Sequence, residues 1–138
     1  MQVEQNGFVL TTGKHKMDAE LIHQFLTNES YWSKGITLEK VKRSMEHSLC
    51  FGIFYEDKQV GFARVITDYV RMAYIADVFI LPAYRGKGLG KWLMKNILSH
   101  PDLQEIKRWL LGTADAHELY KKFGFTALAH PERFMEKV

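Results

Sequence analysis

The ten-residue run Met72–Leu81 (MAYIADVFIL) constrains the fold of this chain more than any other stretch, because every residue in it except Asp77 is apolar or aromatic. Such a run predicts a central strand that is buried on both faces, and Pro82 ends it. A glycine-rich turn follows at Arg85–Gly90, and apolar residues then recur at helical spacing over Leu89–Ile97. The sequence therefore predicts a strand–turn–helix unit at the middle of a sheet.

Further elements are predicted on both sides of this unit. Asp18 and Thr37 are each suited to cap a helix, and Asp115 with Glu118 has the D-x-x-E spacing of a capping box for another. The order of elements predicts an α/β (α+β mixed) fold around one central sheet, with residues 1–138 as a single domain. The other predicted strands are Phe8–Thr12, Leu49–Tyr55, Val60–Thr67, Trp109–Thr113, Phe125–Ala129 and Phe134–Val138.

Composition excludes several classes of protein. Hydrophobic residues are 46% and charged residues 25%, which excludes wholesale disorder. The net charge of +3 is low for a dedicated nucleic-acid binder. No apolar run reaches the roughly 18 residues of a membrane span, and the N-terminus has no signal-peptide pattern. With Cys50 as its only cysteine, we expect a cytoplasmic protein without disulfides and without membrane or nucleic-acid partners. No pair of histidines or cysteines has zinc-site spacing, so we expect no metal ion.

The turn Arg85–Lys91 (RGKGLGK) has the composition of an anion-binding site. Glycine lets the backbone approach a ligand without an intervening side chain. The first N–H groups of a helix have no partner within the helix, and the helix dipole adds positive potential there. Both features favour a phosphate or pyrophosphate group. Cationic side chains stand in the same turn, at Arg85, Lys87 and Lys91.

Spacing narrows the class of phosphate ligand. The phosphate-loop pattern requires Ser or Thr after its lysine, whereas Lys91 precedes Trp92. The dinucleotide pattern G-x-G-x-x-G does not fit glycines that stand at every second position. The pattern that fits is R-x-x-G-x-G, formed by Arg85, Gly88 and Gly90. A plain tight turn between strand and helix is the alternative, but it needs neither three alternating glycines nor three cations.

This pattern resembles the signature of the GNAT superfamily of acyl-CoA N-acyltransferases, and the resemblance extends from about Leu49 to Phe125. A second motif, Leu119–Phe125 (LYKKFGF), resembles the family's L-Y-x-x-x-G-F. The stretch Thr113–His117 (TADAH) is similar to that of small stand-alone bacterial members. The resemblance implies a GNAT-like central sheet that is mixed but largely antiparallel, flanked by helices, and splayed at an acetyl-CoA site.

The resemblance also implies an activity, the transfer of an acetyl group from acetyl-CoA to a primary amine by direct attack in a ternary complex. The acceptor would be an amine-bearing small molecule or a peptide, and a homodimer is expected by analogy. Backbone amides of Gly86–Lys91 would hold the pyrophosphate, and the strand edge at Phe79–Leu81 would pair with the pantetheine amides. The implied cofactor-binding residues are Phe79, Ile80, Leu81, Arg85, Gly86, Lys87, Gly88, Leu89, Gly90, Lys91 and Thr113, the last at a place where many members have Asn.

Tyr120 and Asp77 are the candidate catalytic residues. The resemblance implies that Tyr120 lies near the thioester sulfur and gives the leaving thiolate a proton or a hydrogen bond; the alternative is an ordinary core tyrosine. Asp77 is a carboxylate in an apolar strand, so it needs a cleft, a hydrogen bond or a charged partner. It is either the general base that takes the amine proton or a structural partner of a loop or of Arg64.

Three other residues have two interpretations each. His117 either shares a helix face with Tyr120 or faces solvent. Tyr31 and Trp32, between the first two helices, either line the acceptor pocket or belong to the core. For the whole protein, the alternative to an enzyme is a non-catalytic acyl-CoA-binding or sensing module with a GNAT-like fold, and the presence of Tyr120 argues against it.

Overall fold

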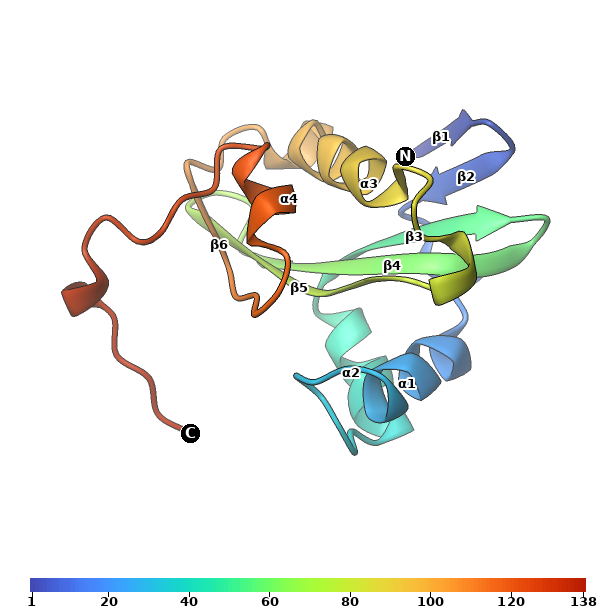
Figure 1. The fold of residues 1–138 in the computed structure, drawn as a ribbon, viewed down its shortest axis with the longest axis horizontal. Helices are drawn as coiled ribbons and strands as arrows, with labels where there is room; N and C mark the ends of the chain where they lie inside the picture. The colour runs from blue at the N-terminus through green and yellow to red at the C-terminus, as the bar shows by residue number, and fades with distance from the viewer.

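Six strands form one sheet at the centre of the computed structural model, which describes residues 1–138 (Figure 1). The strands lie in the order of the sequence, and every neighbouring pair is antiparallel except β5 with β6, which are parallel. This arrangement confirms the predicted mixed, largely antiparallel sheet. The strands are β1 (Gln2–Gln5), β2 (Phe8–Thr11), β3 (Leu49–Tyr55), β4 (Lys58–Thr67), β5 (Met72–Ile80) and β6 (Arg108–Leu111).

Helices cover both faces of the sheet. Figure 1 shows α1 (Ala19–Asn28) and α2 (Leu38–Glu46) on one face, and α3 (Leu89–Leu98) and α4 (His117–Lys121) on the other. Short 3-10 helices occur at η1 (Lys14–Lys16), η2 (Pro82–Tyr84), η3 (Pro101–Leu103) and η4 (Pro131–Arg133). None of the helices has the length and apolar character that a membrane crossing requires.

The helix caps follow the predicted chemistry at two of three places. A carboxylate oxygen of Asp18 accepts a hydrogen bond from the N–H of Leu21, and the Thr37 hydroxyl accepts one from the N–H of Lys40. Both satisfy an N–H that has no partner inside its helix. The predicted capping box at Asp115 is wrong. The N-cap of α4 is Ala116 and no side chain caps the helix, while the N–H of Ala116 donates to the Thr113 hydroxyl at 3.0 Å.

Each face of the sheet has its own hydrophobic core, because successive strand residues point to opposite sides. On β4, Phe62 packs toward α1 and α2, whereas its neighbour Ala63 belongs to the core beneath α3. Phe79 of β5 stacks on Phe25 of α1 with ring centroids 4.0 Å apart. Leu93 of α3 is completely buried in the other core, and burial of such a side chain contributes roughly 1.5–3 kcal/mol.

The sheet opens between β5 and β6. Their ladder runs only from the pair Met72 and Arg108 to the pair Ile75 and Leu111. Beyond Ile75, β5 continues to Ile80 with β4 as its only strand neighbour. A register shift against β4 lies in the same stretch, where Asp77 has a positive φ of 55°. The predicted splay is therefore confirmed, and it begins at a bulge.

The two ends of the chain differ from the sequence-based expectation. The segments Phe125–Ala129 and Phe134–Val138 are not strands, which is a correction. Neither segment pairs with a strand of the sheet, and a strand is stable only within a ladder. At the other end, β1 was not predicted because Gln2–Gln5 is polar and largely exposed. Its signal was Asn6-Gly7, the turn favoured in two-residue hairpins, and both residues have positive φ.

Candidate active site

The glycine-rich turn connects β5 to α3 and faces open space. Gly86 and Gly88 have φ values of 79° and 78°, and Gly88 is the N-cap of α3. A side chain there would be strained, yet a Cβ added at either position would meet no atom of the protein within 4 Å. A Cβ at Gly90 would instead stand 3.6 Å from the Leu119 side chain. Gly86 and Gly88 therefore leave room for a ligand, whereas the space beside Gly90 is bordered by α4.

The cations of this region have different surroundings. Arg85 donates from Nε to the carbonyl oxygen of Ile80 at 2.9 Å, so it closes the end of β5. Lys87 is exposed. The neighbouring Lys122, the C-cap of α4, lowers the pKa of the Lys91 ammonium, so two cations lie close together here. The sequence analysis did not select Lys122, although it stands two residues after Tyr120 in the second motif.

The residues on the edge of β5 that were predicted to bind the cofactor can offer a ligand their main-chain groups rather than their side chains. The Phe79 side chain is buried against α1, and Ile80 and Leu81 are half-buried. The N–H of Leu81 donates to the carbonyl oxygen of Val60 on β4. Leu89 is buried in the core below α3. A ligand along this edge would meet the main chain between Ala76 and Ile80.

Tyr120 lies on α4 with its ring in the core. Its exposed fraction is 7%, and its ring contacts Phe125 edge-on. Burial, followed by the nearby Tyr31 and Asp115, raises the pKa of the Tyr120 phenol to about 12. No buried side-chain oxygen or nitrogen lacks a partner, and the Tyr120 hydroxyl has none within the protein. The hydroxyl therefore reaches solvent and stays protonated at neutral pH.

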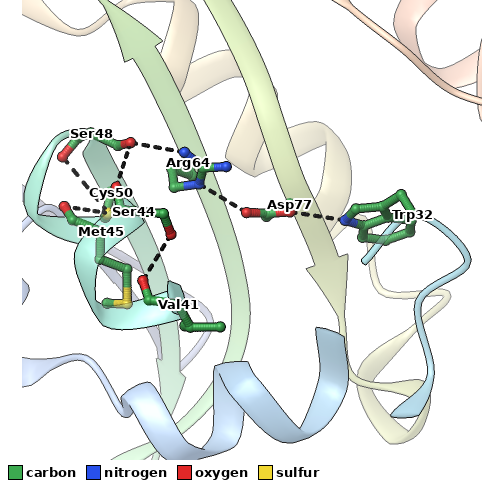
Figure 2. A network of polar contacts seen from close by, with 8 residues as sticks. All are labelled: Trp32, Val41, Ser44, Met45, Ser48, Cys50, Arg64 and Asp77. Atoms are coloured by element: carbon green, nitrogen blue, oxygen red, sulfur yellow. Dashed lines mark hydrogen bonds and ion pairs between the residues drawn. The ribbon is translucent and has the colours of Figure 1, made fainter. Parts of the chain in front are cut away.

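Asp77 is held between two donors, as Figure 2 shows. One carboxylate oxygen accepts from Nε of Arg64 at 2.8 Å, and the other accepts from Nε1 of Trp32 at 2.9 Å. Arg64 also donates to the Ser48 hydroxyl. The Asp77 side chain is 8% exposed. Asp77 is thus bonded to both partners that a structural role would give it, the loop and Arg64. Its role as a general base stays a prediction.

The loop between α1 and α2 crosses the opening of the sheet. Trp32 binds Asp77 on β5, and the hydroxyl of Tyr31 accepts at 2.7 Å from the N–H of Ala114, just beyond β6. The two aromatic rings meet edge-on with centroids 5.0 Å apart. Both residues are partly exposed, with Tyr31 at 52% and Trp32 at 41%. They are therefore not core residues, and they join the two strands that separate at the site.

Two cavities flank Tyr120 and the turn. A cavity of about 840 Å³ is lined by β6, by α4 and by the segment Phe125–Ala129, and both Tyr120 and Thr113 border it. His117 also borders it and is exposed. A smaller cavity of about 290 Å³ lies at the start of α3. Its lining consists of Gln5, Gly88, Lys91, Trp92, Lys95 and Phe123.

Neither a metal site nor a reactive thiol is present in the structure. No three His, Cys, Asp or Glu side chains are grouped so as to hold a metal ion. Cys50 is completely buried on β3, and burial raises the pKa of its thiol to about 11. A thiol that stays protonated is a poor nucleophile. The groups that the site offers are the glycine turn, the Tyr120 phenol and the Asp77 carboxylate.

Comparison with known proteins agrees with this geometry. Residues 19–125 match the model of the acetyltransferase (GNAT) family. A crystal structure of a GNAT-family protein from Xanthomonas campestris is 44% identical, with a TM-score of 0.94 over 98% of this chain and 95% of that one. An uncharacterized N-acetyltransferase of Prochlorococcus marinus is 38% identical over 85 residues, 58% of this chain and 47% of its own length. A GNAT acetyltransferase from Elizabethkingia anophelis, solved with acetyl-CoA bound, shares the fold with 13% identity and a TM-score of 0.68 over 97% of this chain and 89% of that one.

Proposed function

Because the chain belongs to the acetyltransferase (GNAT) family, we propose that it transfers an acetyl group from acetyl-CoA to a primary amine by direct attack. One observation carries the proposal: the edge of β5 that is unpaired beyond Ile75 leads directly into the glycine turn at the start of α3. Tyr120 lies on the neighbouring helix α4, whose Leu119 side chain approaches Gly90 of α3. The three features match the three parts of acetyl-CoA. Tyr120 would serve the thioester, the edge of β5 the pantetheine amides, and the glycine turn the pyrophosphate.

The turn would bind the pyrophosphate. The space in front of Gly86 and Gly88 is free of protein atoms, and the first N–H groups of α3 point into it as donors. Lys122 disfavours the charged form of Lys91, and an anion between the two cations would relieve their repulsion. These residues fit the diphosphate of acetyl-CoA, and they also fit its ribose phosphate.

The free edge of β5 would orient the pantetheine arm. An extended ligand with amide groups can add to an open strand edge as a further strand does. The edge from Ala76 to Ile80 is available for this because β6 ends at Leu111. A strand N–H aimed at the thioester carbonyl would also stabilise the oxyanion that forms during attack.

Tyr120 would assist the departure of sulfur by hydrogen bonding. During the transfer the amine nitrogen bonds to the carbonyl carbon, the carbon–sulfur bond breaks, and the thiolate of coenzyme A leaves. A free thiol has a pKa of roughly 8.5, well below the pKa of about 12 of the Tyr120 phenol. Complete proton transfer to the thiolate is therefore uphill by roughly three orders of magnitude. A hydrogen bond that strengthens as charge develops on sulfur is the better role.

Asp77 would receive the proton that the amine loses, directly or through water. A carboxylate has about four lone-pair sites, and Arg64 and Trp32 occupy two of them. Asp77 also fixes Trp32, so the acceptor amine would bind beside the loop that crosses the opening. The partly exposed rings of Tyr31 and Trp32 would form its wall.

A thiol-release assay tests the proposal. Purified protein is given acetyl-CoA and a panel of polyamines, amino acids, small amines and peptides. Thiol release that requires both acetyl-CoA and an amine is the expected result. Calorimetric binding of acetyl-CoA with no release across the panel would instead indicate a sensing module. Absence of acetyl-CoA binding would overturn the proposed function altogether.

A further inference from the structure

The hydroxyl of Tyr31 is bound to the turn from which α4 begins. It accepts a hydrogen bond of 2.7 Å from the N–H of Ala114, 83 positions along the chain. In the same turn the Thr113 hydroxyl accepts from the N–H of Ala116, the N-cap of α4. The carbonyl oxygen of Ala116 in turn accepts from the N–H of Tyr120. A short series of bonds thus joins the Tyr31 hydroxyl to the helix that carries Tyr120.

The two phenols are close enough for one to affect the ionisation of the other. Burial is the largest cause of the raised pKa of the Tyr120 phenol, and Tyr31 comes next, ahead of Asp115. The Tyr31 oxygen accepts from Ala114, but its own proton has no acceptor in the protein. The Tyr120 hydroxyl has no partner in the protein either. Two O–H donors from distant parts of the chain are therefore left free in one region, and such a pair suits a single anionic atom.

The loop that carries Tyr31 does not need this hydroxyl for its shape. The buried Ser30 hydroxyl donates to the carbonyl oxygen of Leu26 and accepts from the N–H of Ser33, so the loop is held from within. Trp32 separately ties it to β5. The Tyr31 side chain is 52% exposed, so packing does little to place it. The bond to the start of α4 therefore sets the position of the hydroxyl rather than the fold of the loop.

On the basis of the proposed function, we propose that Tyr31 is a second catalytic residue, whose hydroxyl donates a hydrogen bond to the thioester sulfur beside that of Tyr120. During the transfer the amine nitrogen bonds to the carbonyl carbon, and the electron pair of the breaking carbon–sulfur bond goes to sulfur. The amine proton goes to Asp77 or to water, and both phenols keep their protons. The two donors share the negative charge that develops on sulfur.

The placement of Tyr31 favours the transition state over the bound substrate. A backbone N–H that donates to the Tyr31 oxygen makes its O–H a stronger donor. The hydroxyl is already in place before the reaction, so no reorganisation is needed as charge forms. A thioester sulfur is a weak acceptor and a thiolate is a strong one. Tyr31 should therefore act on turnover and on binding of the product thiolate, and not on the affinity for acetyl-CoA.

Calorimetry with coenzyme A tests this role without an acceptor amine. A free thiol has a pKa of roughly 8.5, whereas acetyl-CoA has no thiol, so the ratio of the two Kd values isolates the sulfur. The affinity for coenzyme A relative to acetyl-CoA should rise by roughly tenfold between about pH 7 and about pH 9.5 in the wild type. Tyr31→Phe and Tyr120→Phe should each lose most of this rise. Asp115 and the exposed His117, the other titratable groups beside Tyr120 and on its helix, stay the same in every variant.

Two further variants are matched controls for the lost hydroxyl. Trp32→Phe frees the same loop at its other anchor but keeps both phenols, so the rise with pH should remain. Tyr69→Phe removes a hydroxyl from a tyrosine that is 42% exposed on the turn between β4 and β5, and the rise should remain there too. A full rise in Tyr31→Phe would overturn the role of Tyr31. An equal loss in Trp32→Phe would also overturn it, because the position of the loop would then account for the effect.

Turnover is the second readout, measured with an amine from the thiol-release panel where chemistry is rate-limiting. Tyr31→Phe should lower kcat by roughly tenfold and leave the KM for acetyl-CoA unchanged. The variant that lacks both hydroxyls should lose more than either single variant. An unchanged kcat in Tyr31→Phe would remove Tyr31 from the reaction and leave the proposed function standing. A wild-type chain that binds neither acetyl-CoA nor coenzyme A would overturn both.

Discussion

The two sides of the proposed site are built from contacts of different range. The donor side, the turn before α3, consists of residues that are neighbours in the chain, and its geometry follows from two positive φ values and a helix start. The acceptor side, the loop with Tyr31 and Trp32, is held by partners 83 and 45 positions away. Local geometry thus forms the proposed anion site, whereas tertiary contacts form the proposed acceptor wall.

Because of this difference, a substitution in the turn and a substitution in the loop should disturb different properties of the site. A change in the turn acts on the ligand directly, because nothing of the protein lies in front of the glycines. A change in the loop acts through the Asp77 network and reaches the body of the protein through Arg64 and Ser48 (Figure 2). Donor affinity and loop order should therefore vary independently, and the following variants test this.

Gly88→Val should have the largest effect. Its Cβ enters the space proposed for the pyrophosphate, and the left-handed backbone costs a non-glycine residue about 1–2 kcal/mol. We expect acetyl-CoA affinity to fall by roughly 100-fold, equivalent to about 2.7 kcal/mol, as measured by calorimetry. The loop should keep its protection from trypsin.

Gly7→Val is the matched control for this variant. Gly7 has a φ of 83° in the hairpin between β1 and β2, so the backbone strain is similar but no ligand approaches. Acetyl-CoA affinity should stay at the wild-type value. Equal loss of affinity in both variants would assign the effect to strain and remove the turn from the site.

Tyr120→Phe should lower turnover by roughly tenfold, at or below the low end of general acid–base effects, because a thiolate already leaves readily. The KM for acetyl-CoA should change little, since the interaction strengthens in the transition state. Stability should not fall, because the hydroxyl has no partner in the protein. Burial holds the pKa of Tyr120 near 12, so the wild-type rate should show no loss from phenol ionisation below about pH 11. Unchanged turnover where chemistry is rate-limiting would return Tyr120 to a packing role.

The same difference, between contacts of near neighbours in the chain and contacts of distant residues, explains which features could be predicted from the sequence. The central strand, the turn, and the caps at Asp18 and Thr37 depend on adjacent residues, and the structure confirms them. The pairing of Arg64 with Asp77 was one of two alternatives, since both charges stand in apolar strands. The contact of Trp32 with Asp77 could not be predicted, because nothing local specifies a partner 45 positions away.

The wrong predictions have the same origin. Phe125–Ala129 and Phe134–Val138 have strand-like sequences, but neither segment joins a ladder, and β6 pairs only with β5. Asp115 has capping spacing, but α4 has no capping side chain, and the Thr113 hydroxyl instead accepts from the N–H groups of Asp115 and Ala116 just before the helix. In both cases a correct local preference lost to the arrangement around it.

Trp32→Phe should act on the acceptor side alone. It keeps the aromatic ring but removes the N–H that binds Asp77, and one hydrogen bond contributes about 0.5–1.5 kcal/mol. Local opening of the loop should rise by roughly fivefold, which trypsin cleavage after the exposed Lys34 would report. Tyr31→Phe removes the other anchor and should behave alike. A fall in acetyl-CoA affinity in either variant would contradict the independence of the two sides.

The smallest effect concerns His100, at the far end of the helix that begins with the glycine turn. His100 is buried, and its Nδ1 accepts from the N–H of Asp102, which requires a neutral ring nitrogen. Burial lowers the pKa of this imidazole, and the nearby Asp102 only partly offsets it. A lowered pKa means that the unfolded chain takes up the proton first as pH falls. The stabilising contribution is therefore complete above the unfolded pKa of about 6.5 and is lost as pH falls through the folded pKa.

Urea midpoints should drop between about pH 8 and about pH 5 more steeply for the wild type than for His100→Asn, which can still accept the N–H but does not titrate. Equal slopes would show that the anchoring of α3 does not depend on this histidine. The donor side would then owe its position to the apolar packing of α3 alone.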